Sequence, residues 1–253
     1  MSTSARILRL ALIGYGKMGK EIERLAIERQ MEITARVDIE SPSLLIDGVK
    51  KADVAIHFAI PATVVGHVEQ LADLGKNVVL GTTGWQNDRA KIQALVERKG
   101  IGLIHASNFA LGMNIVYHLL REAGSLFNRF EDYDMSVHEV HHKEKLDSPS
   151  GTALTIANIL LSRIGRKKEV LTGSPEGKIR PEQLQVTTAR LGTVVGTHRV
   201  TFDSAADSIE IVHTAKNRTG LALGALLAAE WINGKRGFFT MDDVLADIIK
   251  GQC

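Results

Sequence analysis

The stretch ILRLALIGYGKMG, residues 7–19, decides the fold of this chain. Its first half, Ile7–Ile13, is a short apolar run, the pattern of a strand that is buried on both faces of a parallel sheet. A glycine ends the run, and from Met18 onward apolar residues recur at helical spacing among charged ones, which predicts an amphipathic helix. In Met31–Val37, apolar and polar residues alternate and predict a second strand, which stops at Asp38. The beginning of the chain therefore predicts one strand–helix–strand unit.

The alternation of strands and helices continues as far as residue 105. We expect strands at 54–60, 78–80 and 101–105, and helices at 63–74 and 88–98. Because a crossover must bring each strand back in the same direction, this order predicts a parallel, doubly wound sheet.

After Asn108 the order of elements changes. Helical patterns cover residues 113–127, 152–164, 219–232 and 241–249, strand patterns cover 133–140, 184–191, 194–202 and 208–213, and a charged loop fills 165–181. The closely spaced strands after residue 184 are typical of an antiparallel or mixed open sheet. The predicted fold class is α/β, a Rossmann-type doubly wound parallel sheet with a second α+β domain built on an open mixed sheet. No helix pattern between Asp132 and His213 covers one whole face of that second sheet, so we expect subunits to associate through it.

The composition excludes several classes of protein. In 253 residues, 31 lysines and arginines balance 29 aspartates and glutamates, and the net charge of +2 gives no sign of a nucleic-acid or acidic-lipid partner. With 44% hydrophobic and 24% charged residues, the chain is typical of a globular protein and not of a membrane protein. Its single cysteine, Cys253, fits a reducing compartment, and the apolar run Leu10–Ile13 is too short for a secretory leader, so we expect a cytoplasmic protein.

The motif GYGKMG joins the first strand to the first helix and predicts dinucleotide binding. Gly14 permits the tight turn, Gly16 lets backbone amides approach a pyrophosphate, and Gly19 allows the helix and the strand to pack closely. Asp38 would accept hydrogen bonds from ribose hydroxyls, whereas Lys17 would favour a 2′-phosphate, so the choice between NADH and NADPH stays open at this point. The candidate cofactor-binding residues of the motif are Gly14, Tyr15, Gly16, Lys17, Met18 and Gly19.

Two further strand ends belong to the same crevice, because ligands in such sheets bind beyond the carboxyl ends of the strands. They are Gly81, Thr82 and Thr83, and Ala106, Ser107, Asn108 and Phe109. Small and hydroxylated residues there would let a nicotinamide ring approach backbone groups. Without the first motif, both segments would be read as ordinary polar loops.

Three histidines fall within five positions and are followed by Lys145. We expect His138 to be a partly buried strand residue, while His141 and His142 leave the end of the strand into a loop. The cluster lacks a metal-binding spacing such as HExxH, so no metal site is predicted. Imidazole can move a proton near pH 7, and the lysine makes the local field positive, so acid–base chemistry on an anionic substrate is favoured.

The segment Ser150, Gly151 and Thr152 precedes an apolar helical run and predicts a helix start with free backbone amides, which is a site for an anion. A cationic loop followed by amide donors predicts a small-molecule substrate that carries one or more carboxylates. The alternative is a plain Ser/Thr cap preceded by solvated charges.

The motifs that carry chemistry resemble those of one family over nearly the whole chain. They are GYGKMG, GTTGW, ASNFALGMN, EVHHKEKLDSPSGTA, GTVVGTHRVTF and HTAKNRTGLALGALLAAEWI. The family is 4-hydroxy-tetrahydrodipicolinate reductase, also called dihydrodipicolinate reductase, of the diaminopimelate route to lysine. The resemblance implies that a nicotinamide hydride adds to the cyclic imine formed when the hydroxy substrate loses water, and that the resulting enamine then takes a proton.

The resemblance also implies roles for individual residues. By position, His141 resembles the family's proton donor or acceptor, Lys145 its second proton donor, and His142 a substrate-binding residue. Gly151 and Thr152 resemble residues that hold a substrate carboxylate. The nucleotide-binding positions of the family fall on Lys17, Asp38, Gly81–Thr83 and Ala106–Phe109.

The family organisation leads us to expect a dinucleotide-binding domain at 1–108, a substrate-binding and tetramerisation domain at 109–218, and C-terminal helices at 219–253 that return to the first domain, in a homotetramer. Many members have arginine where Lys17 stands and a basic residue after the acid at position 38, where this chain has Ile39. The missing basic residue at position 39 weakens a site for the 2′-phosphate of NADPH. We therefore expect NADH to be accepted at least as well as NADPH.

Two other functions stay open. A different nicotinamide oxidoreductase, such as an amino-acid dehydrogenase, would share GYGKMG but need not have the paired histidines with Lys145. A non-catalytic dinucleotide-sensing protein would bind a cofactor but have no use for a paired acid and base. Oxidation of NADH when a pyridine dicarboxylate precursor is supplied separates these functions from the reductase.

Overall fold

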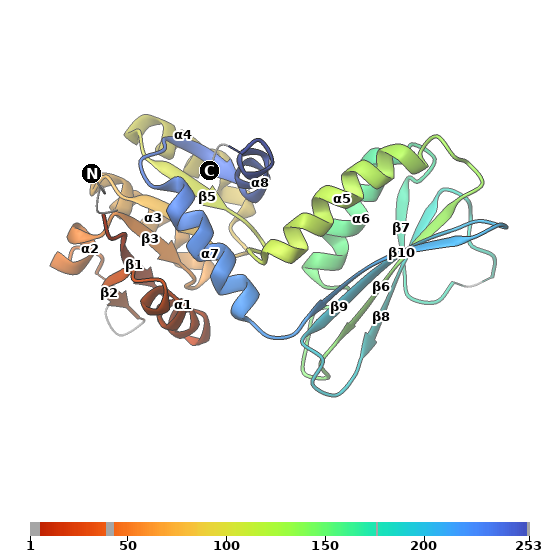
Figure 1. Ribbon diagram of the computed structural model, residues 1–253, viewed down its shortest axis with the longest axis horizontal. Coiled ribbons are helices and arrows are strands. Elements are labelled where there is room, and N and C mark those ends of the chain that lie inside the picture. The colour runs from red at the N-terminus through yellow and green to blue at the C-terminus, as the bar shows by residue number, and fades with distance from the viewer. Residues whose placement is uncertain (1–5, 39–42, 176, 252–253) are drawn as a thin grey trace. The chain divides into compact units, whose positions relative to one another are not determined.

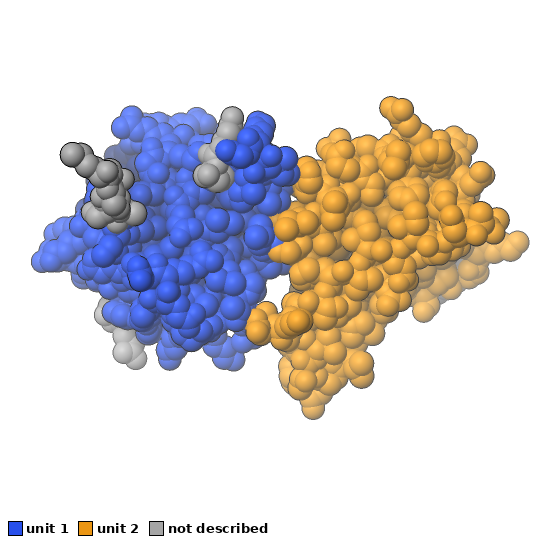
Figure 2. Space-filling view, in the orientation of Figure 1, with its two compact units in different colours: residues 1–111, 218–253 blue, residues 112–217 orange. Residues whose placement is uncertain are grey.

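The computed structural model (Figure 1) describes residues 6–38, 43–175 and 177–251. The chain divides into two units, coloured separately in Figure 2. Unit 1 comprises Met1–Leu111 and Arg218–Cys253, and unit 2 comprises Gly112–Asn217. The sequence places its boundaries after residues 108 and 218, within a few positions of these junctions.

Unit 1 is built on a parallel sheet of six strands in the order β11-β5-β4-β3-β1-β2. The strands are β1 (Arg9–Ile13), β2 (Glu32–Val37), β3 (Val54–His57), β4 (Asn77–Leu80), β5 (Gly102–His105) and β11 (Gly237–Thr240). The α-helices are α1 (Lys17–Glu28), α2 (Asp47–Lys51), α3 (Val64–Asp73), α4 (Arg89–Lys99), α7 (Thr219–Ile232) and α8 (Met241–Ile249), with short 3-10 helices at Pro61–Thr63 and Gln86–Asp88. The doubly wound parallel sheet is confirmed.

Helices cover both faces of this sheet, which explains why its strands are apolar at consecutive positions. In β1, Leu10 and Leu12 pack in one core cluster with residues of α1 and α7. Ala11 and Ile13 pack in a second cluster with residues of α3 and α4. All four side chains are at most 1% exposed, so each step along the strand buries a side chain on one face or the other.

The strand order reverses at β1, which pairs in parallel with β2 on one side and with β3 on the other. In an open α/β sheet, the ligand crevice lies beyond the carboxyl ends of the strands at such a reversal. The residues that follow Ile13 and His57 therefore flank the expected crevice of unit 1.

Unit 2 contains a mixed sheet of five strands in the order β10-β9-β6-β8-β7. Its strands are β6 (Asp134–His141), β7 (Glu169–Thr172), β8 (Gln183–Arg190), β9 (Gly196–Asp203) and β10 (Ser208–Ala215), and its helices are α5 (Leu111–Phe127) and α6 (Gly151–Arg163). β6 and β8 are parallel, as are β7 and β8, while β9 is antiparallel to both β6 and β10. Figure 1 shows α5 and α6 along one face of the sheet. The prediction of a second, mixed sheet is confirmed.

Three short elements were not expected from the sequence. The predicted loop 165–181 contains β7, an edge strand that pairs with β8. Its two end residues are exposed, so polar side chains there remain in contact with water. β11 adds a sixth parallel strand beside β5, and α2 follows β2. Each has only four or five residues, too few to give a periodic pattern.

None of the helices in the ranges described combines the length and the apolar character needed to cross a lipid bilayer.

Helix α7 depends on a close backbone contact at Gly224. A Cβ at this position would lie 1.7 Å from the carbonyl oxygen of Phe109, whereas a Cβ on Gly66 in α3 would meet no atom within 4 Å. We predict that Gly224→Ala lowers the free energy of unfolding by about 1–3 kcal/mol, since overpacking forces the helix away from its partner. The control Gly66→Ala should raise it by up to about 1 kcal/mol through helix propensity. Urea unfolding of both variants checks this, and equal stability of the two would contradict the contact.

Candidate functional site

The turn after β1 and the first turn of α1 each admit only glycine at one position. Gly14 has φ +93°, and its N–H donates to the carbonyl of Val37 at 2.8 Å. A Cβ on Gly14 would lie 2.3 Å from the carbonyl oxygen of Phe58, and a Cβ on Gly19 would lie 2.6 Å from the carbonyl oxygen of Gly14. The turn therefore holds β1, β3 and α1 at backbone contact distance.

The first turn of α1 presents backbone N–H groups. The N-cap residue is Gly16, no side chain caps the helix there, and a Cβ on Gly16 would meet no atom within 4 Å. Uncapped N–H groups and the positive end of the helix dipole favour an anion such as a pyrophosphate. Lys17 and Met18 begin this helix, and Lys17 is exposed.

A cavity of about 480 Å³ lies in front of this turn, within the size range of small-molecule sites. Its lining joins three strand ends and the beginning of the C-terminal segment. The lining residues are Gly16, Lys17, Met18, Phe58, Ala59, Pro61, Gly81, Thr82, Thr83 and Arg218. Neither the residues after β3 nor Arg218 were predicted from the sequence as part of this cavity. Because β3 is the neighbour of β1, the residues at its carboxyl end could have been expected there.

The loop that carries Thr82 is held from three sides. The Thr82 hydroxyl accepts the N–H of Ala59 at 3.0 Å and lies 2.9 Å from Nδ1 of His57, while Nε1 of Trp85 donates to the Thr82 carbonyl at 2.7 Å. Nε2 of His57 is in turn 3.0 Å from Nδ1 of His67. The buried imidazole of His57, in contact with the half-buried His67, thus fixes the backbone of this loop at the edge of the cavity.

The remaining predicted nucleotide-binding residues do not line this cavity. Asp38 is exposed and follows directly on β2, and Tyr15 hydrogen-bonds Glu23. After β5, Ala106 and Asn108 are half-buried, Ser107 is exposed, and Phe109 is a core residue that is 1% exposed. Ile39 lies outside the described residues.

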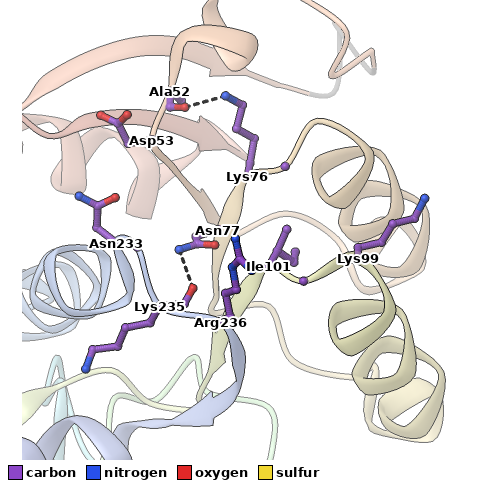
Figure 3. Close-up of a pocket in the computed structure, with 12 residues that line it drawn as sticks. Ala52, Asp53, Lys76, Asn77, Lys99, Ile101, Asn233, Lys235 and Arg236 are labelled. Atoms are coloured by element: carbon purple, nitrogen blue, oxygen red, sulfur yellow. Dashed lines mark hydrogen bonds between the residues drawn. The ribbon is translucent and has the colours of Figure 1, made fainter.

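A second cavity, of about 470 Å³, opens at the opposite, amino-terminal edge of the same sheet (Figure 3). Several of its cations already have partners. Lys76 donates to the carbonyls of Lys50 and Ala52, and Lys99 and Lys235 form ion pairs with Asp73 and Asp247. These contacts tie neighbouring helices and loops together, so we assign this cavity a structural role.

In unit 2, His141 is placed differently from the expectation that it lies in a loop. It is the last residue of β6, two positions from Glu139, so both side chains point to the same face of the sheet. His141 is 8% exposed and Glu139 is fully buried. His138 is half-buried on the strand, with Nδ1 2.7 Å from the Thr187 hydroxyl, as expected of a strand residue. His142 follows the strand and is half-buried.

A buried carboxylate organises this cluster. Oε2 of Glu139 lies 3.3 Å from Nδ1 of His141 and 3.5 Å from Nε2 of His198, while Oε1 accepts the N–H of Ser150 at 2.9 Å and lies 3.5 Å from Nη1 of Arg190. Burial raises the pKa of Glu139, but the neighbouring His198, the hydrogen bond from Ser150 and the charge of His141 outweigh it and lower that pKa to about 2. Glu139 is therefore ionised at neutral pH.

The surroundings keep His141 neutral at pH 7. Burial lowers its pKa to about 4; the charge of Glu139 opposes this shift, and His198, Lys145 and Arg190 add to it. Additional negative charge beside this imidazole would raise its pKa again.

Lys145 stands on the loop between β6 and α6. Its Nζ pairs with Oδ1 of Asp147 at 2.7 Å, and the pKa of Asp147 is lowered by this contact. The Lys145 side chain is 22% exposed, so its ammonium group stays accessible. The guanidinium of Arg190 donates to the carbonyl of Asp147 at 2.6 Å and so ties the loop to β8.

Ser150 is the N-cap of α6, and its polar groups are already engaged. Its hydroxyl accepts the N–H of Ala153 at 3.1 Å and lies 3.3 Å from Nε2 of His198, and the residue is 2% exposed. Substrate contact by the Ser150 side chain is thus disfavoured. Gly151 is exposed, with no atom within 4 Å of a Cβ, and Thr152 is half-buried, so the amides of the first turn are the more accessible donors.

Three of these side chains are of types that bind metals. One ligand atom each of Glu139, His141 and His198 lies within 4.8 Å of the others, the one such group found among the described residues. The guanidinium of Arg190 and the ammonium of Lys145 already place positive charge beside the group. Because like charges disfavour a third cation, the cluster fits a proton network better than a metal site.

The sequence did not lead us to predict Glu139, Arg190 or His198 as members of this cluster. His198 is opposite Glu139 in the β6–β9 register, and Arg190 is opposite His141 in the β6–β8 register. The alternation of β6 could have put Glu139 and His141 on one face, but strand pairing over long sequence distances has no local signal.

Comparison with known proteins covers both units. Residues 8–109 match the family described as dihydrodipicolinate reductase, N-terminus, and residues 112–245 match the family described as dihydrodipicolinate reductase, C-terminus. A 4-hydroxy-tetrahydrodipicolinate reductase of Christiangramia forsetii is 38% identical over 243 residues, which are 96% of this chain and 100% of that protein. The corresponding reductase of Neisseria meningitidis serogroup A is 36% identical over 77% of this chain and 73% of its own.

A solved structure supports the fold assignment. The dipicolinate-bound dihydrodipicolinate reductase from Paenisporosarcina sp. TG-14 superposes with a TM-score of 0.73 at 22% identity, over 92% of this chain and 97% of that one. This chain therefore shares the fold of that reductase.

The buried pair His57–His67 predicts a pH dependence of stability. Burial and the neighbouring His67 lower the pKa of His57 from 6.5 to about 3. Between these values the unfolded chain binds a proton that the folded chain does not, so stability falls as the pH drops below about 6.5, by up to about 1.4 kcal/mol per pH unit for this group. Urea unfolding at several pH values should give a shallower dependence for His57→Asn than for the wild type. An unchanged slope would contradict a buried neutral His57.

Proposed function

The chain belongs to the dihydrodipicolinate reductase family, and we propose that it reduces 4-hydroxy-tetrahydrodipicolinate to tetrahydrodipicolinate with a reduced nicotinamide cofactor, in the diaminopimelate route to lysine. The observation that carries this proposal is that family similarity extends over both units, the one with the dinucleotide turn and the one with the acid–base cluster. A sensor that only bound the cofactor would have no need of the acid–base cluster in unit 2.

Unit 1 has the properties of a dinucleotide site. The uncapped first turn of α1 supplies N–H donors for a pyrophosphate, and the cavity of about 480 Å³ leaves room in front of Gly16. Gly81–Thr83 and Ala106–Phe109 are proposed to approach the nicotinamide end, and Asp38 the ribose. When bound, the reduced nicotinamide supplies the hydride.

The choice of cofactor is proposed from the sequence around Lys17 and Asp38. A carboxylate at the ribose position disfavours a 2′-phosphate, and Lys17 is one exposed cation that favours it. We propose that NADH is accepted at least as well as NADPH. The ratio of kcat/KM for the two cofactors decides this, and a strong preference for NADPH would contradict it.

Unit 2 is proposed to hold the substrate as a dicarboxylate. Lys145 and His142 supply polar contacts beside His141, and the N–H groups of Gly151 and Thr152 donate to one carboxylate at the beginning of α6. The Paenisporosarcina structure is a dipicolinate complex, which agrees with a pyridine dicarboxylate as a ligand of this class.

The proposed chemistry needs a proton after hydride transfer, because the reduced ring is left as an enamine. His141 is neutral in the ligand-free protein, with a pKa of about 4. Two substrate carboxylates bring negative charge next to it and raise its proton affinity, so His141 takes up a proton together with the substrate. The ammonium of Lys145 stabilises the negative charge that develops on the ring, and it is a second group that can supply the one proton that balances the hydride.

We also propose a cytoplasmic homotetramer. Strand β10 is an edge strand of eight residues that pairs only with β9 and leaves Ile209 and Val212 45% and 46% exposed. A long apolar edge of this kind favours association with another copy. The single cysteine, Cys253, supports a reducing compartment.

Substitution of the proposed acid–base residues should separate chemistry from cofactor binding. We predict that His141→Ala and Lys145→Ala each lower kcat by at least about 100-fold, the usual contribution of a positioned proton donor. NADH affinity should stay within about twofold, because the proposed nucleotide contacts belong to unit 1. Steady-state kinetics and fluorescence titration with NADH measure the two quantities.

The control is Lys143→Ala, on the same loop, whose side chain is 74% exposed and pairs only weakly with Glu144 at 3.8 Å. Its kcat should remain near that of the wild type. Loss of NADH affinity in the His141 or Lys145 variant, comparable to the loss of kcat, would contradict the assignment.

Light scattering of the native protein tests the oligomer. We predict a mass of four times the 27.6 kDa of one chain. Val212→Glu should reduce that mass by placing charge on the proposed interface, and Ile27→Glu, at a 62% exposed position of α1, should not. A monomeric wild-type protein would refute the tetramer.

A further inference from the structure

The two carboxylate oxygens of the fully buried Glu139 contact different groups. Oε1 is engaged by the N–H of Ser150 at 2.9 Å and faces the guanidinium of Arg190 at 3.5 Å. Oε2 faces only imidazoles, with Nδ1 of His141 at 3.3 Å and Nε2 of His198 at 3.5 Å. A carboxylate that is hydrogen-bonded on one oxygen is thus aimed at one defined nitrogen of His141.

Regular elements hold these groups in place. Glu139 and His141 share β6, His198 is the register partner of Glu139 on β9, and Ser150 is the N-cap of α6. Side chains on strands are positioned more rigidly than side chains on loops, so the sheet holds Glu139 and His141 in a fixed relative position.

The other ring nitrogen of His141, Nε2, lies close to the backbone of Gly196 on β9. A Cβ on residue 196 would lie 3.0 Å from Nε2 of His141, so glycine at this position of β9 keeps that side of the ring clear. The ring therefore has one nitrogen toward a buried anion and one that no side chain of residue 196 covers.

We propose that Glu139 is a positioning residue for the reductase reaction: its carboxylate accepts the Nδ1 proton of His141 and leaves Nε2 as the nitrogen that exchanges a proton with the substrate. This rests on the proposed function. A carboxylate in such a place fixes the tautomer and the orientation of the imidazole and stabilises its protonated form. The distance of 3.3 Å in the ligand-free protein is expected to shorten in the substrate complex, since catalytic hydrogen bonds tighten there.

The charges around His141 agree with this role. Glu139 is the group that raises the pKa of His141, while His198, Lys145 and Arg190 lower it. Removal of the Glu139 charge therefore lowers the pKa of His141 further and makes proton uptake with the substrate harder.

The decisive variant is Glu139→Gln, which keeps the shape and removes the charge. We expect kcat to fall by about 10- to 100-fold, with the KM for NADH nearly unchanged, because the change touches only the orientation and charge state of His141. The inflection of the pH profile of kcat that His141 causes should move to lower pH. The matched control Glu144→Gln removes a carboxylate whose side chain is 77% exposed on the neighbouring loop, and should do neither.

The double variant Glu139→Gln/His141→Ala should have the same kcat as His141→Ala alone. A role of Glu139 that acted only on stability would instead lower activity in both backgrounds. An additive loss of kcat in the double variant would overturn the proposal.

A measurement on the wild-type protein needs no variant and no substrate. Nitrogen-15 NMR of histidine-labelled protein at neutral pH should give the Nδ1–H tautomer for His141, and the Nε2–H tautomer would overturn the proposal. If the tautomer is as expected but the protein does not reduce 4-hydroxy-tetrahydrodipicolinate, the proposed function fails and the contact stands. Activity lost on chelation and restored by Zn²⁺ would assign the same side chains to a metal and refute the proton role.

Discussion

The buried carboxylate of Glu139 is the interaction on which the second unit depends. A charge without exposed surface is tolerated only when neighbouring groups replace its hydration. Here a backbone N–H at the start of α6, a guanidinium on β8 and imidazoles on β6 and β9 do so. The same contacts that compensate the charge join four elements and place His141 beside the loop of Lys145. Folding and chemistry in this unit therefore rest on one network.

The first unit depends on a different constraint, the close approach of backbones at the end of β1. Gly14 and Gly19 allow the turn, the neighbouring strand and α1 to meet at distances that any side chain would block. The result is an uncapped helix start in front of a cavity, at the edge of the sheet where the strand order reverses. The backbone donors of such a helix start can bind an anion without a charged side chain.

The sequence predicted the parts of this structure that depend on neighbouring residues. GYGKMG connects a strand to the helix that follows it directly, so both its local fold and its candidate binding residues can be predicted from neighbouring positions. His198 lies beside Glu139 because β9 pairs with β6, although the two residues are far apart in the sequence. No local sequence pattern predicts such a contact. The same limit explains β7 and β11, short strands at sheet edges whose partners give them their structure. His141 was placed in a loop because the last residue of a strand and the first residue of a loop look alike in sequence, although one is buried and the other is not.

The central claim is that the dinucleotide turn of one unit and the imidazole–carboxylate pair of the other act on one substrate. A crystal structure of the enzyme with NADH and pyridine-2,6-dicarboxylate tests it most directly. The account predicts the dicarboxylate between the nicotinamide ring and Nε2 of His141, with one carboxylate on the amides of Gly151 and Thr152. A ligand bound elsewhere, with the loop of Lys145 in solvent and remote from the nicotinamide, would contradict it.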